Sequence, residues 1–350
     1  MSNTAKKGKV LVTGVDGYLG CLVVPLLIQD GWDVLGLDAG FYKNGWLYNG
    51  LSTTAETLNK DMRHLTIEDF EGVDAVVAMA ELSNDPVGDL VGPLTYSINH
   101  LGSQHVARTA KAAGVSRFVY MSSCSVYGVA DGTVDEFSSV NPQTAYGECK
   151  YLTENDLWRL ADDNFHPVAL RNATAFGASP RQRFDIVLNN LSGLAYTTGV
   201  IKMTSDGSPW RPMAHALDLA QGILLSLNAP VEKIHGEFFN VGSNDNNYTV
   251  REIAETVANE FEGCELSFGS DGADNRSYKV NFDKITDTLG FKAEWNLARG
   301  ARQLHEVFDA IQLDTETFTG RGHTRLKQIE WLLKTGQVDE NLFWTGSLNK

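Results

Sequence analysis

The sequence predicts an α/β fold in which helices cover both faces of a parallel sheet. Three observations lead to this prediction. Short β-branched runs alternate with helical segments through the first half of the chain, a glycine-rich turn separates the first run from the first helix, and polar motifs follow the ends of several runs. In such a doubly wound sheet, ligands gather at the carboxyl ends of the strands. The 350 residues suffice for this sheet and a second, smaller lobe.

The elements follow one another in the order that a doubly wound sheet requires. The expected strands lie at 9–13, 32–38, 73–80, 117–121 and 166–171, and a later one at 238–242 returns to the main sheet. The expected helices lie at 18–29, 96–113 and 146–162. The alternation weakens after about residue 172. The larger domain is therefore expected at 1–175 with returning segments near 213–243, and the smaller one at 176–212 and 244–350, where residues 312–350 carry no informative motif.

Composition restricts the class of protein. The formal net charge is −15 and the pI is near 4.9, which disfavours binding to nucleic acid or to an anionic membrane, because both need a basic face. No run of 18 apolar residues is present, so no membrane span is expected. The four cysteines (Cys21, Cys124, Cys149 and Cys264) lack the spacing of metal ligands. We expect a soluble, cytoplasmic protein with reduced thiols and no bound metal.

The segment Thr13–Gly20 has the spacing GxxGxxG between an expected strand and an expected helix. Glycine permits a tight bend there and the close approach of a pyrophosphate to backbone N–H groups at the helix start. Asp38 ends the second strand and is placed to accept hydrogen bonds from an adenosine ribose. Its carboxylate would repel a 2′-phosphate, so the sequence favours NAD over NADP. Asp61 and Met62 could touch the adenine edge or form a plain turn.

Tyr146 and Lys150 carry the chemistry, since side chains at i and i+4 share one face of a helix. A lysine ammonium beside a phenol favours the phenolate and lowers the phenol pKa from about 10. Ser123 lies 23 residues before Tyr146, at the end of the preceding strand. Its hydroxyl could reach the same substrate oxygen as the phenol, although Ser122 and Ser125 compete for that role. A proton-transfer site beside a bound cofactor is the leading prediction.

Further candidates belong to the cofactor site or the substrate site. Asn99 could bridge a water toward Lys150 or only hydrogen-bond within the fold. Arg211 and Arg276 could hold phosphate oxygens or form surface ion pairs. The full set of expected cofactor residues is Gly14, Asp16, Gly17, Tyr18, Leu19, Asp38, Asp61, Met62, Met79, Ala80, Asn99, Tyr146 and Lys150. The expected substrate residues are Glu81, Ser83, Ser125, Asn172, Thr174, Asn190, Arg211 and Arg276.

Taken together, these motifs resemble the extended short-chain dehydrogenase/reductase family, in its NAD-dependent nucleotide-sugar epimerase and dehydratase branch. The resemblance spans about residues 8–300 and rests on TGVDGYLG, MSSCSVYG, YGECK, RNATAFG and WRPMAHALDLA. It implies a Rossmann-type domain with tightly held NAD and a smaller C-terminal domain that binds a nucleoside-diphosphate sugar. It also implies a homodimer formed by two helices of each subunit, here 96–113 and 146–162.

The resemblance implies a role for each catalytic residue. Tyr146 would remove a proton from the C4 hydroxyl as hydride passes to NAD, which leaves a 4-keto sugar. Lys150 would hold the nicotinamide ribose and lower the tyrosine pKa, and Ser123 would hydrogen-bond the sugar oxygen. Two positions depart from the family. Thr174 stands where members have an asparagine that binds substrate phosphate, and Glu81 replaces a small residue and adds a carboxylate near the substrate.

The residues after Ser123 separate the subclasses that the resemblance leaves open. The 4,6-dehydratases carry an Asp-Glu pair where this chain has Cys124 and Ser125, and the 3,5-epimerising members carry a cysteine at the Ser125 position. Members similar to UDP-glucose 4-epimerase have a hydroxyl residue there, as this chain does. An epimerase acting on a nucleoside-diphosphate sugar is therefore expected. The alternatives are a ketoreductase, a dehydrogenase or a dehydratase that uses the same site, and a non-catalytic NAD-sensing regulator.

Overall fold

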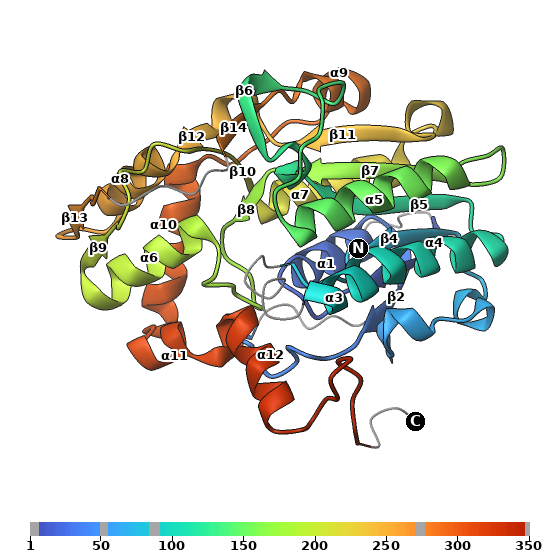
Figure 1. Cartoon of the computed structure of the whole chain (residues 1–350), viewed down its shortest axis with the longest axis horizontal. Helices are drawn as coiled ribbons and strands as arrows, with labels where there is room; N and C mark the ends of the chain where they lie inside the picture. The colour runs from blue at the N-terminus through green and yellow to red at the C-terminus, as the bar shows by residue number, and fades with distance from the viewer. Residues whose placement is uncertain (1–6, 50–54, 84–91, 271–276, 347–350) are drawn as a thin grey trace.

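A seven-stranded parallel sheet forms the centre of the molecule (Figure 1). The computed structural model describes residues 7–49, 55–83, 92–270 and 277–346. Every hydrogen-bonded neighbour in the main sheet is parallel. The strands from one edge to the other are β3 (Glu56–Asn59), β2 (Trp32–Asp38), β1 (Gly8–Thr13), β4 (Ala75–Ala78), β5 (Arg117–Ser123), β7 (His166–Asn172) and β11 (Glu237–Val241). The chain order reverses between β1 and β4, where doubly wound sheets bind ligands.

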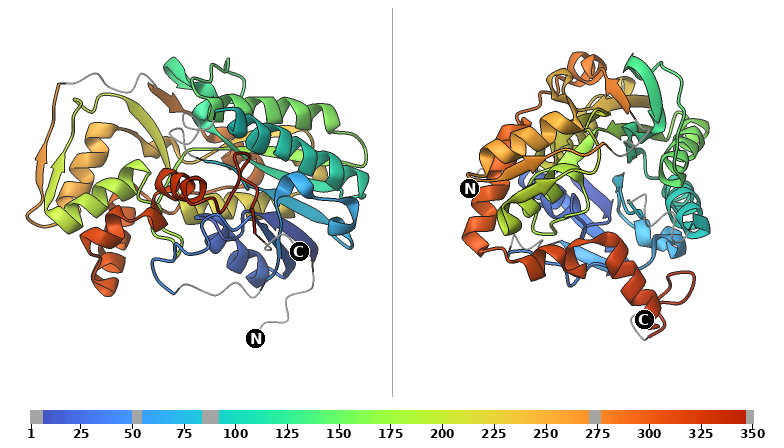
Figure 2. Two further views of the ribbon diagram at one scale, coloured as in Figure 1. Left: turned by 60° about the horizontal axis from the view of Figure 1, so that its bottom comes forward. Right: turned by 60° about the vertical axis from the view of Figure 1, so that its left-hand side comes forward.

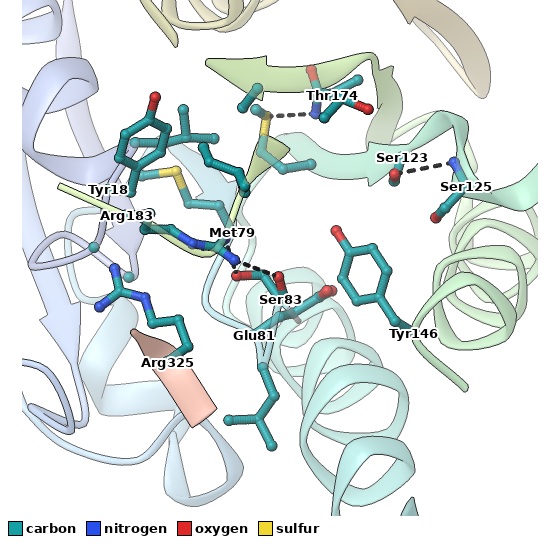
Figure 3. A pocket seen from close by; sticks show the side chains of 18 of the residues that line it. Tyr18, Met79, Glu81, Ser83, Ser123, Ser125, Tyr146, Thr174, Arg183 and Arg325 are labelled. Carbon is teal, nitrogen blue, oxygen red and sulfur yellow. Dashed lines mark hydrogen bonds between the residues drawn. The ribbon is translucent and has the colours of Figure 1, made fainter. Parts of the chain in front are cut away.

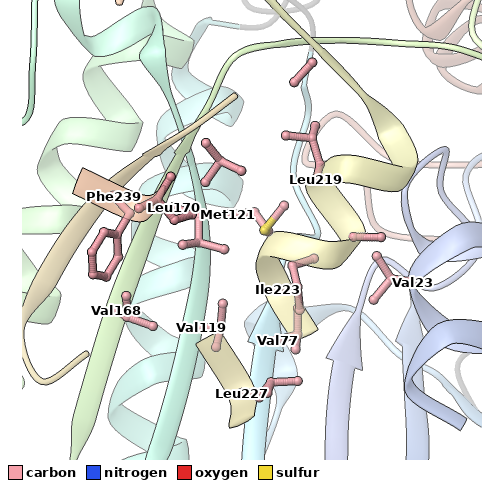
Figure 4. Close-up of a cluster of buried hydrophobic side chains, with 14 of the residues drawn as sticks. Val23, Val77, Val119, Met121, Val168, Leu170, Leu219, Ile223, Leu227 and Phe239 are labelled. Atoms are coloured by element: carbon pink, nitrogen blue, oxygen red, sulfur yellow. The ribbon is translucent and has the colours of Figure 1, made fainter. Parts of the chain in front are cut away.

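Helices cover both faces of this sheet, as the sequence predicts (Figures 1 and 2). On one face lie α1 (Gly20–Gln29) and α7 (Ala216–Asn228), whose apolar side chains meet those of the strands (Figure 4). On the other face lie α4 (Ser103–Ala112) and α5 (Ala145–Leu160). The strands are buried on both sides, which explains their continuous apolar runs. The strand predicted at 238–242 is β11, and it does return to the main sheet.

Most predicted elements differ from the structure by one or two residues at their ends, and three differences have a clear structural cause. The helix predicted from residue 18 begins at Gly20, because Tyr18 lies in the glycine turn. The strand predicted to reach residue 80 ends at Ala78, since the N–H groups of Met79 and Ala80 each donate to Thr13 Oγ1 at 3.0 Å. The helix predicted at 96–113 is divided into a π-helical segment η3 (Tyr96–Gly102) and α4, and the short helix α3 (Gly92–Thr95) precedes it.

A second lobe with its own core packs beside the carboxyl ends of the strands. Its main helices are α6 (Val187–Thr198), α8 (Val250–Glu260) and α10 (Leu297–Ile311). Smaller strands surround them or link the lobe to the main sheet: β6 (Val129–Val134), β8 (Thr174–Phe176), β9 (Val200–Lys202), β10 (Trp210–His215), β12 (Asn247–Thr249), β13 (Glu265–Ser267) and β14 (Ser277–Val280). The short helix α9 (Asp283–Leu289) lies near β11.

The C-terminal strap, residues 313–346, begins in the core of the second lobe, where Leu313 and Phe318 are buried, and ends against the main sheet. It contains α11 (Thr315–Thr319), the 3₁₀ turn η7 (Arg321–His323) and α12 (Arg325–Lys334), and it runs from the smaller lobe toward the N-terminal strands (Figure 1). Ile329, Leu332, Val338 and Leu342 join the same buried cluster as Leu37 of β2. The strap therefore completes one face of the sheet.

Within the described ranges, no helix has the length and apolar character needed to cross a bilayer. The same ranges contain no group of three or more His, Cys, Asp or Glu side chains arranged to hold a metal ion.

Candidate active site

A cavity of about 580 Å³ opens at the carboxyl ends of the main strands, between the sheet and the second lobe. Its floor is formed by the glycine turn and the ends of β2, β4, β5 and β7. The second lobe contributes Ile186, Val187, Pro209 and Arg211, among others. Figure 3 shows two groups of polar side chains facing each other across this space. This is the edge of the sheet at which the sequence predicts ligand binding.

The glycine turn is tight because its glycines lie against backbone. Gly14 has φ +78°, and a Cβ there would lie 3.1 Å from Ala80 Cα at the end of β4. A Cβ on Gly20 would lie 2.4 Å from the carbonyl oxygens of Gly14 and Val15. Gly17 also lines the cavity. The turn thus brings the start of α1 to the cavity, where a phosphate would meet the positive end of the helix.

Asp38 ends β2 and lines the cavity, in the position where the sequence predicts contact with an adenosine ribose. Its carboxylate accepts hydrogen bonds from the N–H of Gly40 at 2.7 Å and of Asp16 at 3.1 Å, and burial raises the pKa of Asp38. Asp61 lines the cavity too, although its carboxylate is already paired with Arg63 at 2.7 Å. Tyr18, Leu19, Met62, Met79 and Ala80 are lining residues as well.

Ser123, Ser125 and Tyr146 form the hydroxyl wall of the cavity (Figure 3). Ser123 ends β5, and its Oγ accepts a hydrogen bond from the N–H of Ser125 at 3.1 Å. Tyr146 lies in the first turn of α5, which begins at the N-cap Thr144. Of the competing serines, Ser122 donates its hydroxyl to Glu154 at 2.5 Å, deep in the protein. Ser123 and Ser125 are therefore the serines that present their hydroxyls to the cavity.

Lys150 lies behind the hydroxyl wall in a buried charged network. Its Nζ lies 2.6 Å from Glu81 Oε2, donates to the carbonyl of Met121, and is 5.3 Å from the centre of the Tyr146 ring. Tyr120 donates its phenol to the other Glu81 oxygen at 2.7 Å. Burial alone would lower the pKa of Lys150, but the adjacent carboxylate outweighs burial and raises it. Glu81 lines the cavity, as the sequence predicts, but its two carboxylate oxygens are engaged by Lys150 and Tyr120.

Cys124 is directed away from the cavity. It begins a 3₁₀ turn, η4 (Cys124–Tyr127), where the chain leaves the extended conformation of β5. Its side chain is buried, its Sγ contacts the carbonyl of Arg171 at 3.1 Å, and burial raises its pKa. A thiol in this position fills the core.

The other expected site residues divide into two groups. Ser83, Asn172, Thr174 and Arg211 line the cavity. Asp16, Asn99 and Asn190 are not among the lining residues, and Arg276 lies outside the described part of the chain.

The three residues outside the lining have structural partners. Asn99 is buried and binds both backbone groups of Leu82, at 2.9 and 3.0 Å, which agrees with the second of the two roles considered for it. Asn190 donates to the carbonyl of Phe184 at 2.9 Å. The Asp16 N–H donates to Asp38.

Sequence reasoning missed the arginine wall, formed by Arg183 and Arg325 opposite the hydroxyl wall (Figure 3). Arg183 follows β8 and pairs with Asp185 at 2.8 Å. Arg325 comes from α12 of the C-terminal strap. For Arg183, a signal was available, since it lies six positions after the end of the RNATAFG motif used for the resemblance. For Arg325, no motif was available, because only the tertiary fold brings α12 to the cavity.

The residues present fit a dinucleotide together with a polar substrate. At the glycine turn, the cavity is lined by backbone without side chains, so a pyrophosphate could approach it closely. Asp38 lies at the end of β2, where a ribose would lie. On the opposite side, the buried atoms Ser125 Oγ and Asn172 Oδ1 have no hydrogen-bond partner among the described residues. Buried polar atoms without partners are costly, so both atoms favour a bound ligand.

Comparisons with known proteins agree with this fit. The sequence model of the NAD-dependent epimerase/dehydratase family matches residues 10–242. A UDP-glucose 4-epimerase of Bacillus subtilis (strain 168) is 28% identical over 283 residues, which are 70% of this chain and 80% of that protein. A putative UDP-glucose 4-epimerase of Methanocaldococcus jannaschii is 25% identical over 306 residues, 84% of this chain and 96% of that protein.

Solved structures share the whole fold. MoeE5 in complex with UDP-glucose and NAD has a TM-score of 0.76 at 25% identity, and the match covers 87% of this chain and 100% of that one. The NDP-hexosamine 5,6-dehydratase TunA has a TM-score of 0.77 at 21% identity, covering 87% of this chain and 98% of that one. The family match spans more than half of the chain and includes both the glycine turn and the hydroxyl wall. The chain therefore belongs to the NAD-dependent epimerase/dehydratase family, and its cofactor is NAD.

Proposed function

We propose that this protein is an epimerase that inverts a carbinol carbon of a nucleoside-diphosphate sugar through a transient 4-keto sugar. The observation that carries the proposal is the hydroxyl wall, where Ser123, Ser125 and Tyr146 face one cavity while Cys124 points away. Epimerisation by oxidation and reduction at one carbon needs a group that takes and returns one proton. It needs no second acid or base for loss of water.

Each residue of the wall has a proposed task. Tyr146 takes the proton of the sugar hydroxyl and returns it at the end of the cycle. Ser123 donates a hydrogen bond to the same oxygen. Bound NAD supplies the hydride acceptor and donor for that carbon. Lys150 holds a positive charge behind the phenol and thereby favours its deprotonated form.

The surroundings of the wall argue against the other subclasses. A dehydratase needs a carboxylate pair to remove a proton and protonate the leaving hydroxyl. The positions after Ser123 are Cys124 and Ser125, and the carboxylate of Glu81 is engaged by Lys150 and Tyr120. A 3,5-epimerase would need a thiol at the cavity, and Cys124 is buried behind it. The lack of a free carboxylate pair after Ser123 and the burial of Cys124 both support inversion at the oxidised carbon itself.

For the substrate, we propose a UDP-sugar as the first class to test. The curated relatives are named UDP-glucose 4-epimerases, and MoeE5 is described with UDP-glucose and with UDP-glucuronic acid. Arg211 of β10 lines the second-lobe side of the cavity and would hold the substrate phosphates. Thr174 stands where family members have an asparagine, so its hydroxyl would replace that amide contact.

The test is a substrate panel followed by proton NMR. UDP-, GDP-, CDP- and dTDP-sugars are incubated with protein purified without added cofactor, in D₂O. An epimerase of this kind gives the inverted sugar with no deuterium at carbon and no net change in nicotinamide absorbance. Accumulation of NADH would instead identify a dehydrogenase, and deuterium at C3 or C5 would identify a mechanism that removes a carbon-bound proton.

We also propose a homodimer through η3, α4 and α5. Three large side chains in these helices are exposed: Leu101 (54%), Tyr151 (36%) and Trp158 (64%). Apolar groups gathered on two neighbouring helices are typical of a protein–protein interface. Sedimentation velocity of the chain and of Leu101→Asp tests this, with a dimer expected for the first and a monomer for the second. A monomeric unmodified chain would reject it.

A further inference from the structure

Arg325 is a buried arginine without a fixed acceptor. It is 5% exposed and lines the cavity. Its guanidinium lies 3.9 Å from the centre of the Tyr42 ring. Among the described residues, the guanidinium forms no ion pair and no hydrogen bond, and only the backbone N–H of Arg325 meets a carboxylate, that of Asp185. Burial lowers its pKa to about 10, so the side chain still carries its charge at neutral pH. A buried cation of this kind is costly without an anion.

Arg183 provides a second guanidinium on the same side of the cavity (Figure 3). Two of its nitrogens bind Ser83, at 3.0 Å to Oγ and 3.1 Å to the carbonyl, and its Nε donates to Asp185 at 2.8 Å. These contacts orient the planar group toward the cavity. The Asp185 carboxylate also accepts a hydrogen bond from the backbone N–H of Arg325 at 3.1 Å. One carboxylate thus links the two arginines of the wall.

The arginine wall belongs to the cofactor half of the cavity. Tyr42, under Arg325, follows β2 and Asp38, and Ser83, bound by Arg183, follows β4. The glycine turn lies between the ends of these two strands, because β1 lies between β2 and β4. A dinucleotide on that turn would have its pyrophosphate nearest to this wall.

The C-terminal strap is fastened to the same side. Gln328 donates to the carbonyl of Phe41 at 2.8 Å, and the Trp344 indole donates to the carbonyl of Ala39 at 2.6 Å. Arg63 donates to the carbonyl of Asn341 at 3.0 Å. These bonds fix α12 against the loop that follows Asp38, so the position of Arg325 is set by the loop that borders the ribose site.

We propose that Arg183 and Arg325 together bind the pyrophosphate of NAD, and that the C-terminal strap is therefore part of the cofactor site. Arg325 lies outside residues 10–242, the segment that matches the family. The contact would therefore be an addition to the part of the cofactor site that the family segment provides. Guanidinium groups bind phosphate oxygens through paired, charge-assisted hydrogen bonds. The bound pyrophosphate would supply the anion that Arg325 lacks.

The test compares Arg325→Gln with Lys327→Gln, an exposed cation on the same helix. The first measurement is the NAD content of each purified protein. The second is titration calorimetry of protein freed of NAD, with NAD, ADP, adenosine and UDP as separate probes. Arg325→Gln should weaken the binding of NAD and of ADP by roughly ten- to a hundredfold, the size expected for losing a charged hydrogen bond. The affinities for adenosine and UDP should stay unchanged. Lys327→Gln should bind all four as the unmodified chain does.

The outcomes distinguish binding of the NAD pyrophosphate from binding of the substrate phosphates. A loss of UDP affinity with unchanged ADP affinity would assign the wall to the substrate and overturn the proposal, as would unchanged NAD retention. Should Arg325→Gln fail to fold, Arg183→Gln tests the same claim from another element and should give the same ordering of probes. Because the measurements are of binding alone, they stand even if the protein does not epimerise any sugar in the panel.

Discussion

The two walls of the cavity are built in different ways. The hydroxyl wall comes from 24 consecutive residues, Ser123 to Tyr146, at the end of one strand and the start of the next helix. The arginine wall comes from positions 142 residues apart, and its neighbour Tyr42 lies in a third segment. Chemistry held by a local segment leaves a motif with fixed spacing. Chemistry assembled across the fold leaves none, although both walls border the same cavity.

The difference extends to how each wall is supported. Behind the hydroxyl wall, Lys150 and Glu81 form a buried pair whose side chains are 3% and 2% exposed. Breaking such a pair leaves an uncompensated charge and is strongly destabilising. Behind the arginine wall, Arg183 pairs with Asp185 through side chains that are 11% and 10% exposed, and α12 is held by apolar packing and by a hydrogen bond to the loop after β2. Substitutions behind the hydroxyl wall are therefore expected to destabilise the protein more than substitutions behind the arginine wall.

The largest expected effect is on turnover alone. Tyr146→Phe should lower kcat by a factor on the order of 10² or more, because it removes the general base, and should leave NAD content unchanged. The measurement is the rate of sugar inversion by NMR, with NAD content from the same preparation. An unchanged rate would reject the base assignment, and a parallel loss of NAD would show that the two walls cannot be separated.

A substitution of Asp38 should have the opposite effect: it should weaken the binding of NAD and leave the turnover rate unchanged. Asp38→Ala removes the carboxylate at the adenosine end and should weaken NAD binding by about tenfold, the size of one or two hydrogen bonds to a charged group. Turnover at saturating NAD should stay the same. Asp33→Ala, an exposed aspartate of the same strand, is the matched control. Equal retention of NAD and NADP by the unmodified protein would contradict the proposed role of Asp38.

The sequence was a good guide where neighbours in the chain are neighbours in space. The main strands, the glycine turn and the placing of the serine cluster and Tyr146 at one cavity follow from periodicity and spacing, whereas the choice of Ser123 within that cluster came from the family resemblance. It was a poor guide to side chains whose partners are distant. Glu81 was expected near the substrate and does line the cavity, but its pairing with Lys150, 69 positions away, was not foreseen, because no pattern in one sequence reports such a pair.

The position of the C-terminal strap could not be predicted, because the residues that it packs against are also distant in the sequence. Ile329 and Leu332 are spaced for one face of a helix, yet nothing in residues 312–350 indicates which surface that face covers. The π-helical segment at Tyr96–Gly102 was also unforeseen. Asn99 within it binds Leu82, a contact between segments that a local propensity cannot encode.

A third prediction concerns the charge behind the hydroxyl wall. Glu81→Gln removes the anion that balances Lys150, which favours the phenolate of Tyr146 and lowers the pKa of Lys150. Both changes move the same way, so the pH profile of kcat/KM should shift to lower pH by about one unit. Tyr120→Phe removes a hydrogen bond to Glu81 but no charge, and its profile should stay in place. Equal shifts in both variants would assign the effect to packing instead of charge.

The smallest expected effect tests whether the strap holds NAD through its packing. Ile329→Val in α12 and Ile253→Val in α8 each remove one methylene from a fully buried side chain, so each should lower the free energy of unfolding by about 1 kcal/mol in urea titrations. Only the strap variant should also lose some NAD affinity, by less than Arg325→Gln does, because loosening α12 displaces the guanidinium. If both variants, or neither, changed NAD affinity, the packing of the strap would contribute nothing specific to the cofactor site, and Arg325 would act through its charge alone.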